Sequence, residues 1–343
     1  MVCYDCEFQF MDRSPLSRIV GGFAAQRILV IGDLMLDEFI WGRVSRISPE
    51  APVPVVEVTS ESYYPGGAAN VARNVREFTG HTAVMGIVGG DAPGERLLGL
   101  LRQSGIDIAC VQSDAAGFTT TKTRVIARHQ QVVRVDREKK EALAPARADR
   151  AMESLERAGA DADAVIVADY GKGFLTQPLA DAITRWAAAH RKILTVDPHP
   201  HTSLRWNGAT TVKPNRIEAF LAVGMPPSDP VEPVLQDGRL LEAGEQLLRK
   251  WSCGSVLITL GDQGMLLLQP GQPPYHTPTR AQSVFDVSGA GDTAIAVYTL
   301  ALASGATPAE AAEIANRASG IVVGKLGTAT VSAGELTHGL VQG

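Results

Sequence analysis

Short runs rich in Val, Ile and Leu recur along this chain, at 27–33, 84–89, 164–169 and 192–197. Runs of this length with few polar positions indicate strands that are buried on both faces, as in a parallel sheet. Between several of them the apolar positions fall three or four residues apart, which is typical of helices. The alternation of strand and helix patterns predicts an α/β fold with a mostly parallel central sheet.

Two segments depart from this alternation. From 38 to 64 the pattern changes to short alternating pieces that are broken by three prolines. Between 119 and 136 two alternating runs surround His129 and Gln130. Alternation with a period of two indicates strands with one exposed face, and proline keeps to sheet edges. We therefore predict a small antiparallel excursion from the main sheet for the first segment and a β-hairpin for the second.

Charged residues follow several of the buried runs. The carboxyl ends of parallel strands share one edge of a sheet, and ligands of open α/β sheets bind at that edge. A loop charge in water is the alternative for each residue alone, but together they predict a polar cleft whose acids hold substrate hydroxyls and whose loop lysine binds an anion. The candidates are Asp33, Asp37, Asp169, Lys172, Asp197 and Lys213.

The segment 286–292 combines small residues with an acid and leads directly into a long apolar run. Gly289, Ala290 and Gly291 leave the first amides of the expected helix uncovered, and such a helix end attracts anions. Asp292 stands in the first turn beside the same point, where it can act as the general base for phosphoryl transfer to an alcohol. The alternative is a tight turn with an acid that favours the helix dipole.

A second glycine motif opens an Ala-rich helix pattern after Pro65. Gly66 and Gly67 allow a ligand to come close to the backbone, and Asn70 offers both a donor and an acceptor to a polyol. The alternative is a tight turn packed under a helix, with Asn70 as a cap.

Two further segments suggest a nucleotide and its metal ion. Asn215 and Glu218 stand one helical turn apart after a short strand, and their oxygens suit Mg2+ held partly through water, although a capping interaction explains them equally well. Thr259, Gly261 and Gly264 lie in a strand–turn–strand pattern where a nucleotide could rest, or in a plain hairpin.

The hairpin expected at 119–136 carries a row of cations. Lys122, Arg124 and Arg128 share one face by the period of two, and Arg134 lies on the return strand. A row of this kind is often merely solvated, yet here it could bind a second phosphate on the substrate.

Composition limits the classes of function and the cellular compartment that we expect. The chain has 343 residues and a net charge of −5, without a Lys/Arg cluster that would favour nucleic acid. The apolar runs are too short to span a membrane, and four cysteines suit a reducing compartment, so we expect the cytoplasm. Cys3 and Cys6 form a C-x-x-C without a second ligand pair. We expect residues 1–26 to be a poorly ordered extension and 27–343 to be one domain.

From about Arg27 to its C-terminal end the chain resembles the ribokinase-like (PfkB) carbohydrate kinases. Residues 66–72 resemble the N-terminal signature of that family and 286–292 the C-terminal one. The resemblance implies a three-layer sandwich with a mostly parallel sheet, and a small β lid built from about 38–64 and 119–136 that pairs two subunits into a homodimer. ATP and Mg2+ are implied as well, and a K+ requirement stays open.

The same resemblance distributes the site residues. Asp292 would be the catalytic base, the amides of 289–291 the anion hole, and Asn215 with Glu218 the group that organises Mg2+ and the ATP phosphates. The sugar would be held by Asp33, Asp37, Gly66, Gly67, Asn70 and Asp169, and the nucleotide by Asp197, Lys213, Thr259, Gly261, Gly264 and Asn316.

Three stretches, at 32–37, 47–56 and 169–173, resemble the bacterial heptose 7-phosphate kinases more specifically. This implies phosphorylation of D-glycero-β-D-manno-heptose 7-phosphate at its anomeric hydroxyl, with Lys172, Arg124, Arg128 and Arg134 on the phosphate of the sugar. Some such kinases carry a nucleotidyltransferase domain, and we expect this chain to be the kinase-only form. Fructose 6-phosphate or ribose is the alternative substrate. An NAD-dependent oxidoreductase is disfavoured, because the chain lacks the dinucleotide-binding glycine fingerprint after its first strand. A non-catalytic sugar sensor is disfavoured by the intact Asp292 motif.

Overall fold

The computed structural model describes residues 15–128, 130–280, 285–325 and 327–341. Within this part of the chain the buried runs line up as a nine-stranded sheet in the order β13-β12-β11-β10-β9-β8-β1-β4-β5. Neighbours from β11 to β5 pair in parallel, and β12 and β13 extend the sheet antiparallel at one edge. The strands are β1 (Arg27–Gly32), β4 (His81–Gly89), β5 (Asp107–Asp114), β8 (Ala164–Ala168), β9 (Ile193–Asp197), β10 (Thr211–Val212), β11 (Ser255–Thr259), β12 (Met265–Leu268) and β13 (Tyr275–Thr277).

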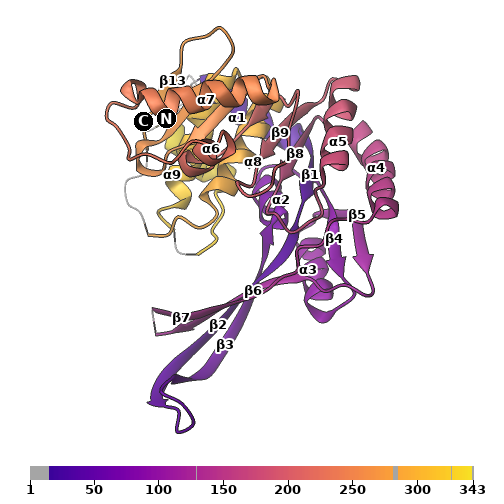
Figure 1. Ribbon diagram of the computed structural model, residues 1–343, viewed down its shortest axis with the longest axis vertical. Helices are drawn as coiled ribbons and strands as arrows, with labels where there is room; N and C mark the ends of the chain where they lie inside the picture. Colours follow the sequence, from indigo (N-terminus) through magenta and orange to yellow (C-terminus); the bar gives the residue numbers. More distant parts are fainter. Residues whose placement is uncertain (1–14, 129, 281–284, 326, 342–343) are drawn as a thin grey trace, which may run out of the picture.

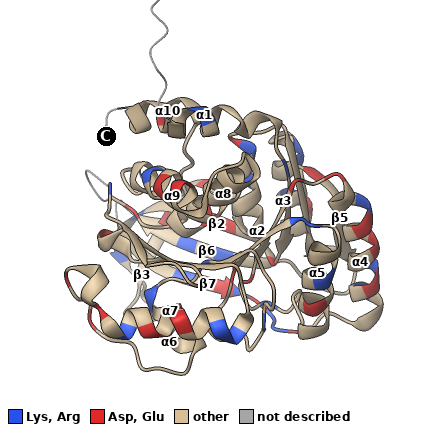
Figure 2. Ribbon diagram, turned by 90° about the horizontal axis from the view of Figure 1, so that it is seen from above, with Lys and Arg blue, Asp and Glu red and all other residues tan. Residues whose placement is uncertain are grey.

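Helices cover both faces of this sheet, which gives three layers (Figure 2). Each side of the central strand β1 belongs to a different hydrophobic cluster: Ile28 and Val30 pack on one side, Leu29 and Ile31 on the other. One face carries α1 (Pro15–Gly21), α2 (Ala68–Arg76), α3 (Ala92–Gln103), α8 (Ala290–Ala303), α9 (Pro308–Val322) and α10 (Ala333–Val341). The opposite face carries α4 (Pro145–Ala160), α5 (Gln177–Ala189), α6 (Arg216–Ala222) and α7 (Gly238–Trp251).

Helix α8 explains the long apolar run after the 286–292 motif. Its residues from Thr293 to Ala301 are buried, because the helix packs against α2, α9 and the edges of β8 and β9. Among the described residues, no helix combines the length and the apolar character that a bilayer span requires.

A second, four-stranded sheet projects from the body of the molecule, in the order β3-β2-β6-β7 (Figure 1). Its strands are β2 (Leu34–Ile47), β3 (Pro54–Gly67), β6 (Thr120–Ala127) and β7 (Gln130–Arg137). The hairpin expected at 119–136 is β6 and β7. In place of short pieces at 38–64, the structure has two 14-residue antiparallel strands, whose pairing shifts at two irregularities. We call this second sheet the lid.

The expectation of an unordered N-terminal extension is wrong for residues 15–26. There the chain forms α1 and a 3-10 turn at Phe23–Ala25. Val20 and Phe23 are buried, and the ring of Phe23 packs edge-on against Phe78 at a centroid distance of 5.4 Å. These apolar side chains pack against the main hydrophobic core, and their burial holds the segment in place. Cys3 and Cys6 lie outside the described residues.

Candidate active site

A cleft of about 610 Å³ opens at the carboxyl edge of the large sheet. Its wall comes from the segments that follow β8 to β11 and from the first turns of α6 and α8. The edge therefore gathers most of the residues that the sequence motifs single out. Those lining the cleft are Asp169, Asp197, Lys213, Asn215, Glu218, Thr259, Gly261, Gly264, Ala290, Gly291, Asp292 and Asn316.

Both carboxylate oxygens of Asp292 accept a hydrogen bond. The Tyr170 hydroxyl donates to Oδ1 at 2.5 Å, and the Asn70 amide donates to Oδ2 at 2.6 Å. Burial raises the pKa of Asp292 above its usual value, while these two donors and the Lys213 ammonium act in the opposite direction. The expected base thus stands in the first turn of α8 in a defined orientation, facing the cleft.

The N-terminus of α8 is built as the glycine motif predicts. Gly289 precedes the helix with φ of 82°, a left-handed conformation that favours glycine, and a Cβ there would lie 3.3 Å from the Asn70 amide. Ala290 and Gly291 follow as the first helical residues on the cleft wall. This arrangement fits an anion site at a helix N-terminus.

A buried ion pair lies beside this helix end. Lys213 Nζ is 3.0 Å from Asp197 Oδ2, and a Cβ on Gly291 would lie 3.5 Å from the same ammonium. Burial raises the pKa of Asp197 to about 7. Burial alone would lower the pKa of Lys213, but the carboxylates of Asp197 and Glu218 outweigh it and raise that pKa. Lys213 is thus a permanent cation next to the amides of α8.

Asn215 and Glu218 form a capping box at the start of α6. The Asn215 side chain accepts from the Glu218 N–H at 2.9 Å, and Glu218 Oε2 accepts from the Asn215 N–H at 2.7 Å. The capping alternative is therefore what the structure shows, although both residues line the cleft. Among the described residues no three acidic, His or Cys side chains gather as a metal site. A Mg2+ ion here would depend on water and substrate phosphates, as this ion commonly does.

The turn at 259–264 borders the cleft, and its two glycines have different surroundings. Gly261 has φ of 62° and open space around its Cβ position. Gly264 instead passes close to β13, because a Cβ there would lie 2.1 Å from the Thr277 carbonyl oxygen. Asn316 of α9 donates to the Thr277 hydroxyl at 3.0 Å and to the Pro278 carbonyl at 2.7 Å, so its amide fixes the cleft wall.

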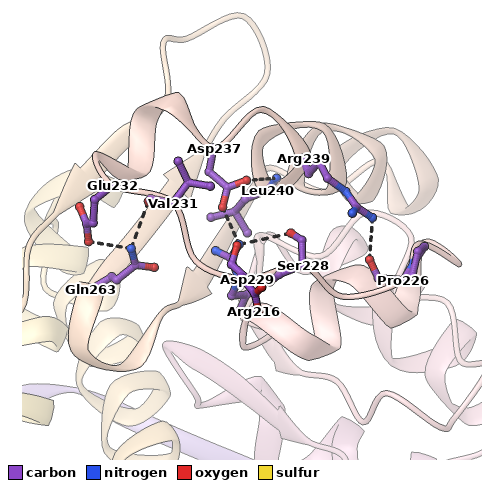
Figure 3. Close-up of polar contacts among 10 residues, drawn as sticks. All are labelled: Arg216, Pro226, Ser228, Asp229, Val231, Glu232, Asp237, Arg239, Leu240 and Gln263. Atoms are coloured by element: carbon purple, nitrogen blue, oxygen red, sulfur yellow. Dashed lines mark hydrogen bonds and ion pairs between the residues drawn. The ribbon is translucent and has the colours of Figure 1, made fainter.

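The loop between α6 and α7 is tied to this side of the cleft (Figure 3). Arg216 contacts Asp237 at 2.5 Å, and both side chains are largely buried. Gln263 of the 259–264 turn donates to the Val231 carbonyl at 3.1 Å and to Glu232 at 2.6 Å. These contacts join the starts of α6 and α7 to the 259–264 turn.

In the structure Asp33 holds the loop that follows β8. Its carboxylate is buried and accepts backbone N–H bonds from Tyr170 at 3.0 Å and from Lys172 and Phe174 at 3.1 Å each. Asp169 is also engaged: it accepts from the Gly171 N–H at 2.8 Å and from the Thr202 hydroxyl at 2.5 Å. Burial raises the pKa of Asp169 to about 6. Both acids hold the 169–174 loop.

Asp37 is the acid that faces the second glycine motif. A Cβ on Gly66 would lie 2.5 Å from Asp37 Oδ2, so only glycine lets this carboxylate come so close to the backbone. Gly67 has φ of 59° and precedes the first residue of α2. Arg124 of the lid contacts Asp37 Oδ1 at 2.6 Å. Gly66 thus serves close packing against Asp37, whereas a Cβ on Gly67 would lie 2.6 Å from the Asp33 carbonyl oxygen.

The cations that the sequence analysis assigns to the sugar phosphate do not share one task. Lys172 is paired with Glu138 at 2.5 Å, and Arg134 with Asp136 at 2.9 Å. Arg128 does not continue the row of Lys122 and Arg124, contrary to the prediction. The pairing of β6 with β2 runs without a shift up to Ala127, the last residue of the strand, and Arg128 is exposed in a left-handed turn beyond that end. The period of two holds only within the strand, so it does not place a residue that follows the end of the strand.

Comparison with known proteins places the chain in a family. A family model described as pfkB family carbohydrate kinase matches residues 25–333. The chain belongs to this family. It is therefore a sugar kinase, and the predicted enzyme class and family are confirmed.

Two relatives are each named Bifunctional protein HldE. The one from Desulfatibacillum aliphaticivorans is 42% identical over 314 residues, which are 92% of this chain and 63% of that protein. The one from Geobacter sulfurreducens is 41% identical over 330 residues, 96% of this chain and 66% of that protein. The chain thus spans a little under two thirds of the length of these relatives.

Two solved structures confirm the ribokinase-like fold. The match to Arabidopsis thaliana ribokinase, in complex with ribose and ATP, has a TM-score of 0.71 at 17% identity. It covers 92% of this chain and 98% of the ribokinase chain. Phosphofructokinase-2 from Escherichia coli, in complex with substrates and products, has a TM-score of 0.73 at 20% identity, with 92% and 99% covered.

Tyr170 is the site residue that sequence reasoning missed. Its place directly after Asp169, at the end of a buried strand, was the available signal. The hydrogen bond from the Asn70 amide to Asp292 was missed as well.

Proposed function

We propose that this chain transfers the terminal phosphoryl group of ATP to the anomeric hydroxyl of D-glycero-β-D-manno-heptose 7-phosphate, giving the 1,7-bisphosphate. The observation that carries the kinase chemistry is the Asp292 carboxylate in the first turn of α8, on the same cleft as Lys213. The choice of acceptor is supported by the stretches 32–37, 47–56 and 169–173 and by the 42% and 41% identity to the HldE relatives.

In this proposal the oxygen of the sugar hydroxyl bonds to the terminal phosphorus of ATP, and Asp292 accepts the proton of that hydroxyl. The bond from that phosphorus to the bridging oxygen breaks, and ADP leaves with the electron pair. The amides of Ala290 and Gly291 and the Lys213 ammonium stabilise negative charge on the phosphoryl oxygens. A Mg2+ ion bound near Asn215 and Glu218 would neutralise charge on the ATP phosphates.

A phosphate on the acceptor gives the cations of the lid a purpose. Lys122 is paired in register with Asp37, so both side chains lie on the same face of the lid. Burial and the neighbouring Lys172 ammonium both lower the pKa of Lys122. The two ammonium groups repel each other, and a bound phosphate would relieve that repulsion. We assign the sugar phosphate to Lys122, Lys172 and Arg124, with Arg134 at the rim, and not to Arg128.

We further propose that the protein is a homodimer joined through its lid. The lid exposes apolar side chains on β3 and β7, among them Val58, Val133 and Val135. An exposed sheet with open edges is commonly covered by a partner. We also propose that the reaction belongs to ADP-heptose synthesis for the lipopolysaccharide core and takes place in the cytoplasm.

The test is ADP release from ATP and Mg2+ with a panel of acceptors. The panel holds D-glycero-β-D-manno-heptose 7-phosphate, the same heptose without phosphate, fructose 6-phosphate and ribose. We expect selective turnover of the heptose phosphate. Faster turnover of fructose 6-phosphate would move the protein to another sugar phosphate, and faster turnover of ribose would also refute the phosphate site on the lid.

A further inference from the structure

Tyr170 has no role in the family resemblance, yet it makes the shortest contact to the expected base. Its hydroxyl donates to Asp292 Oδ1 at 2.5 Å, across 122 residues of sequence. Burial and the neighbouring carboxylates of Asp292 and Asp197 raise the pKa of Tyr170 well above its usual value. The phenol therefore keeps its proton at any pH at which the enzyme would work, and it remains a donor.

The backbone around Tyr170 is fixed from below by Asp33. Three successive alternate N–H groups, of Tyr170, Lys172 and Phe174, donate to its two carboxylate oxygens. Gly171 between them has φ of 65°, which bends the chain around this carboxylate. Asp33 follows β1 and Tyr170 follows β8, and these two strands are paired in the sheet. The phenol is thus attached to the rigid edge of the sheet.

The second oxygen of Asp292 is held by a chain of hydrogen bonds through Asn70 and Asn74. Asn70 donates to Oδ2, and the Asn70 carbonyl accepts from the Asn74 amide at 2.9 Å. Asn74 in turn accepts from the Thr293 hydroxyl at 2.7 Å, next to Asp292 in α8. Each carboxylate oxygen has a further lone pair, so a substrate hydroxyl can donate to Asp292 while both contacts persist.

We propose that Tyr170 is a positioning residue for the Asp292 base, and that Asp33 holds it in place through the 170–174 loop. The inference rests on the proposed role of Asp292 as base. The phenol and the Asn70 amide favour the charged carboxylate, and each donor occupies one lone pair of its oxygen, which fixes the orientation of the carboxylate and leaves another lone pair for a substrate hydroxyl. The other charged groups that act on Asp292 are Lys213, Asp37 and Asp197.

The sign of the effect on acidity follows from these contacts. The hydrogen bond from Tyr170 lowers the pKa of Asp292 against the effect of burial. Without the hydroxyl the pKa of Asp292 rises, so the base is protonated, and inactive, up to a higher pH. A hydrogen bond to a charged group corresponds to a shift of about one pH unit or more.

The test compares the pH profiles of kcat/KM for the wild type, Tyr170→Phe and Tyr298→Phe. Tyr298 is buried in the same helix as Asp292, but its hydroxyl contacts Thr211 instead, so it controls for loss of a buried hydroxyl. We expect the acidic limb of Tyr170→Phe to move up by about one unit, with the limb of Tyr298→Phe unchanged. Asp33→Asn should move the limb in the same direction, and the double variant no further than Tyr170→Phe.

A second measurement keeps this inference separate from the proposed function. Carboxyl 13C resonances of labelled aspartate, compared with Asp292→Asn, report the titration of Asp292 without turnover. A midpoint in Tyr170→Phe equal to that of the wild type would overturn the inference, even in an active enzyme. A raised midpoint in a protein that turns over no acceptor of the panel would support the inference and refute the proposed function. An Asp33→Asn midpoint equal to the wild type would remove Asp33 from the account.

Discussion

At the scale of single residues, the lid assigns different tasks to cations that look alike in the sequence. Lys122 shares a face of the lid with Asp37, whereas Arg128 is exposed beyond the end of the same strand. Lys122→Met should raise the KM for a sugar phosphate by about tenfold or more, the worth of one charge-assisted hydrogen bond, and leave the KM for ATP unchanged. Arg128→Met is the matched control and should change neither constant. Equal effects of the two variants, measured by steady-state kinetics, would refute the phosphate assignment.

At the scale of elements, the wall of the cleft beside the 259–264 turn depends on how α6 and α7 are joined. Asp237 pairs with Arg216 and also accepts the Leu240 N–H at the start of α7. Asp237→Ala should lower the free energy of unfolding by about 3–5 kcal/mol, because it leaves a buried guanidinium unpaired. Glu245→Ala removes an exposed pair with Arg249 on the same helix and should cost less than about 1 kcal/mol. Urea denaturation measures both, and similar losses would contradict this ranking.

Local patterns also decide how much of the structure the sequence could predict. The buried runs and the start of α8 at Ala290 follow from neighbouring residues, and both predictions are confirmed. The bond from Tyr170 to Asp292 joins distant segments, so no local pattern contains it. Arg128 was misplaced because the period of two does not say where the strand ends. Asn215 and Glu218 suit a cap and a cation equally, and composition alone could not choose.

At the scale of the whole molecule, the lid projects from the body with apolar side chains in solvent (Figure 1). Val133 is 47% exposed and alternates with Arg134 along β7, so the two lie on opposite faces. If the lid joins two subunits, Val133→Lys should weaken the dimer at least tenfold, because it places a charge in an apolar interface. Gln130→Lys, on an exposed end of the same strand, is the control. Sedimentation equilibrium of a monomeric wild type would refute the proposed dimer.

The central claim is that Asp292 is the general base of a sugar kinase, and Asp292→Asn tests it most directly. The change keeps the size of the side chain and removes the proton acceptor. We predict that kcat for the best acceptor of the panel falls by about a thousandfold or more, in line with general-base catalysis, while ATP binding measured by calorimetry is retained. A variant that binds ATP and turns over at the rate of the wild type would show that Asp292 is not the base.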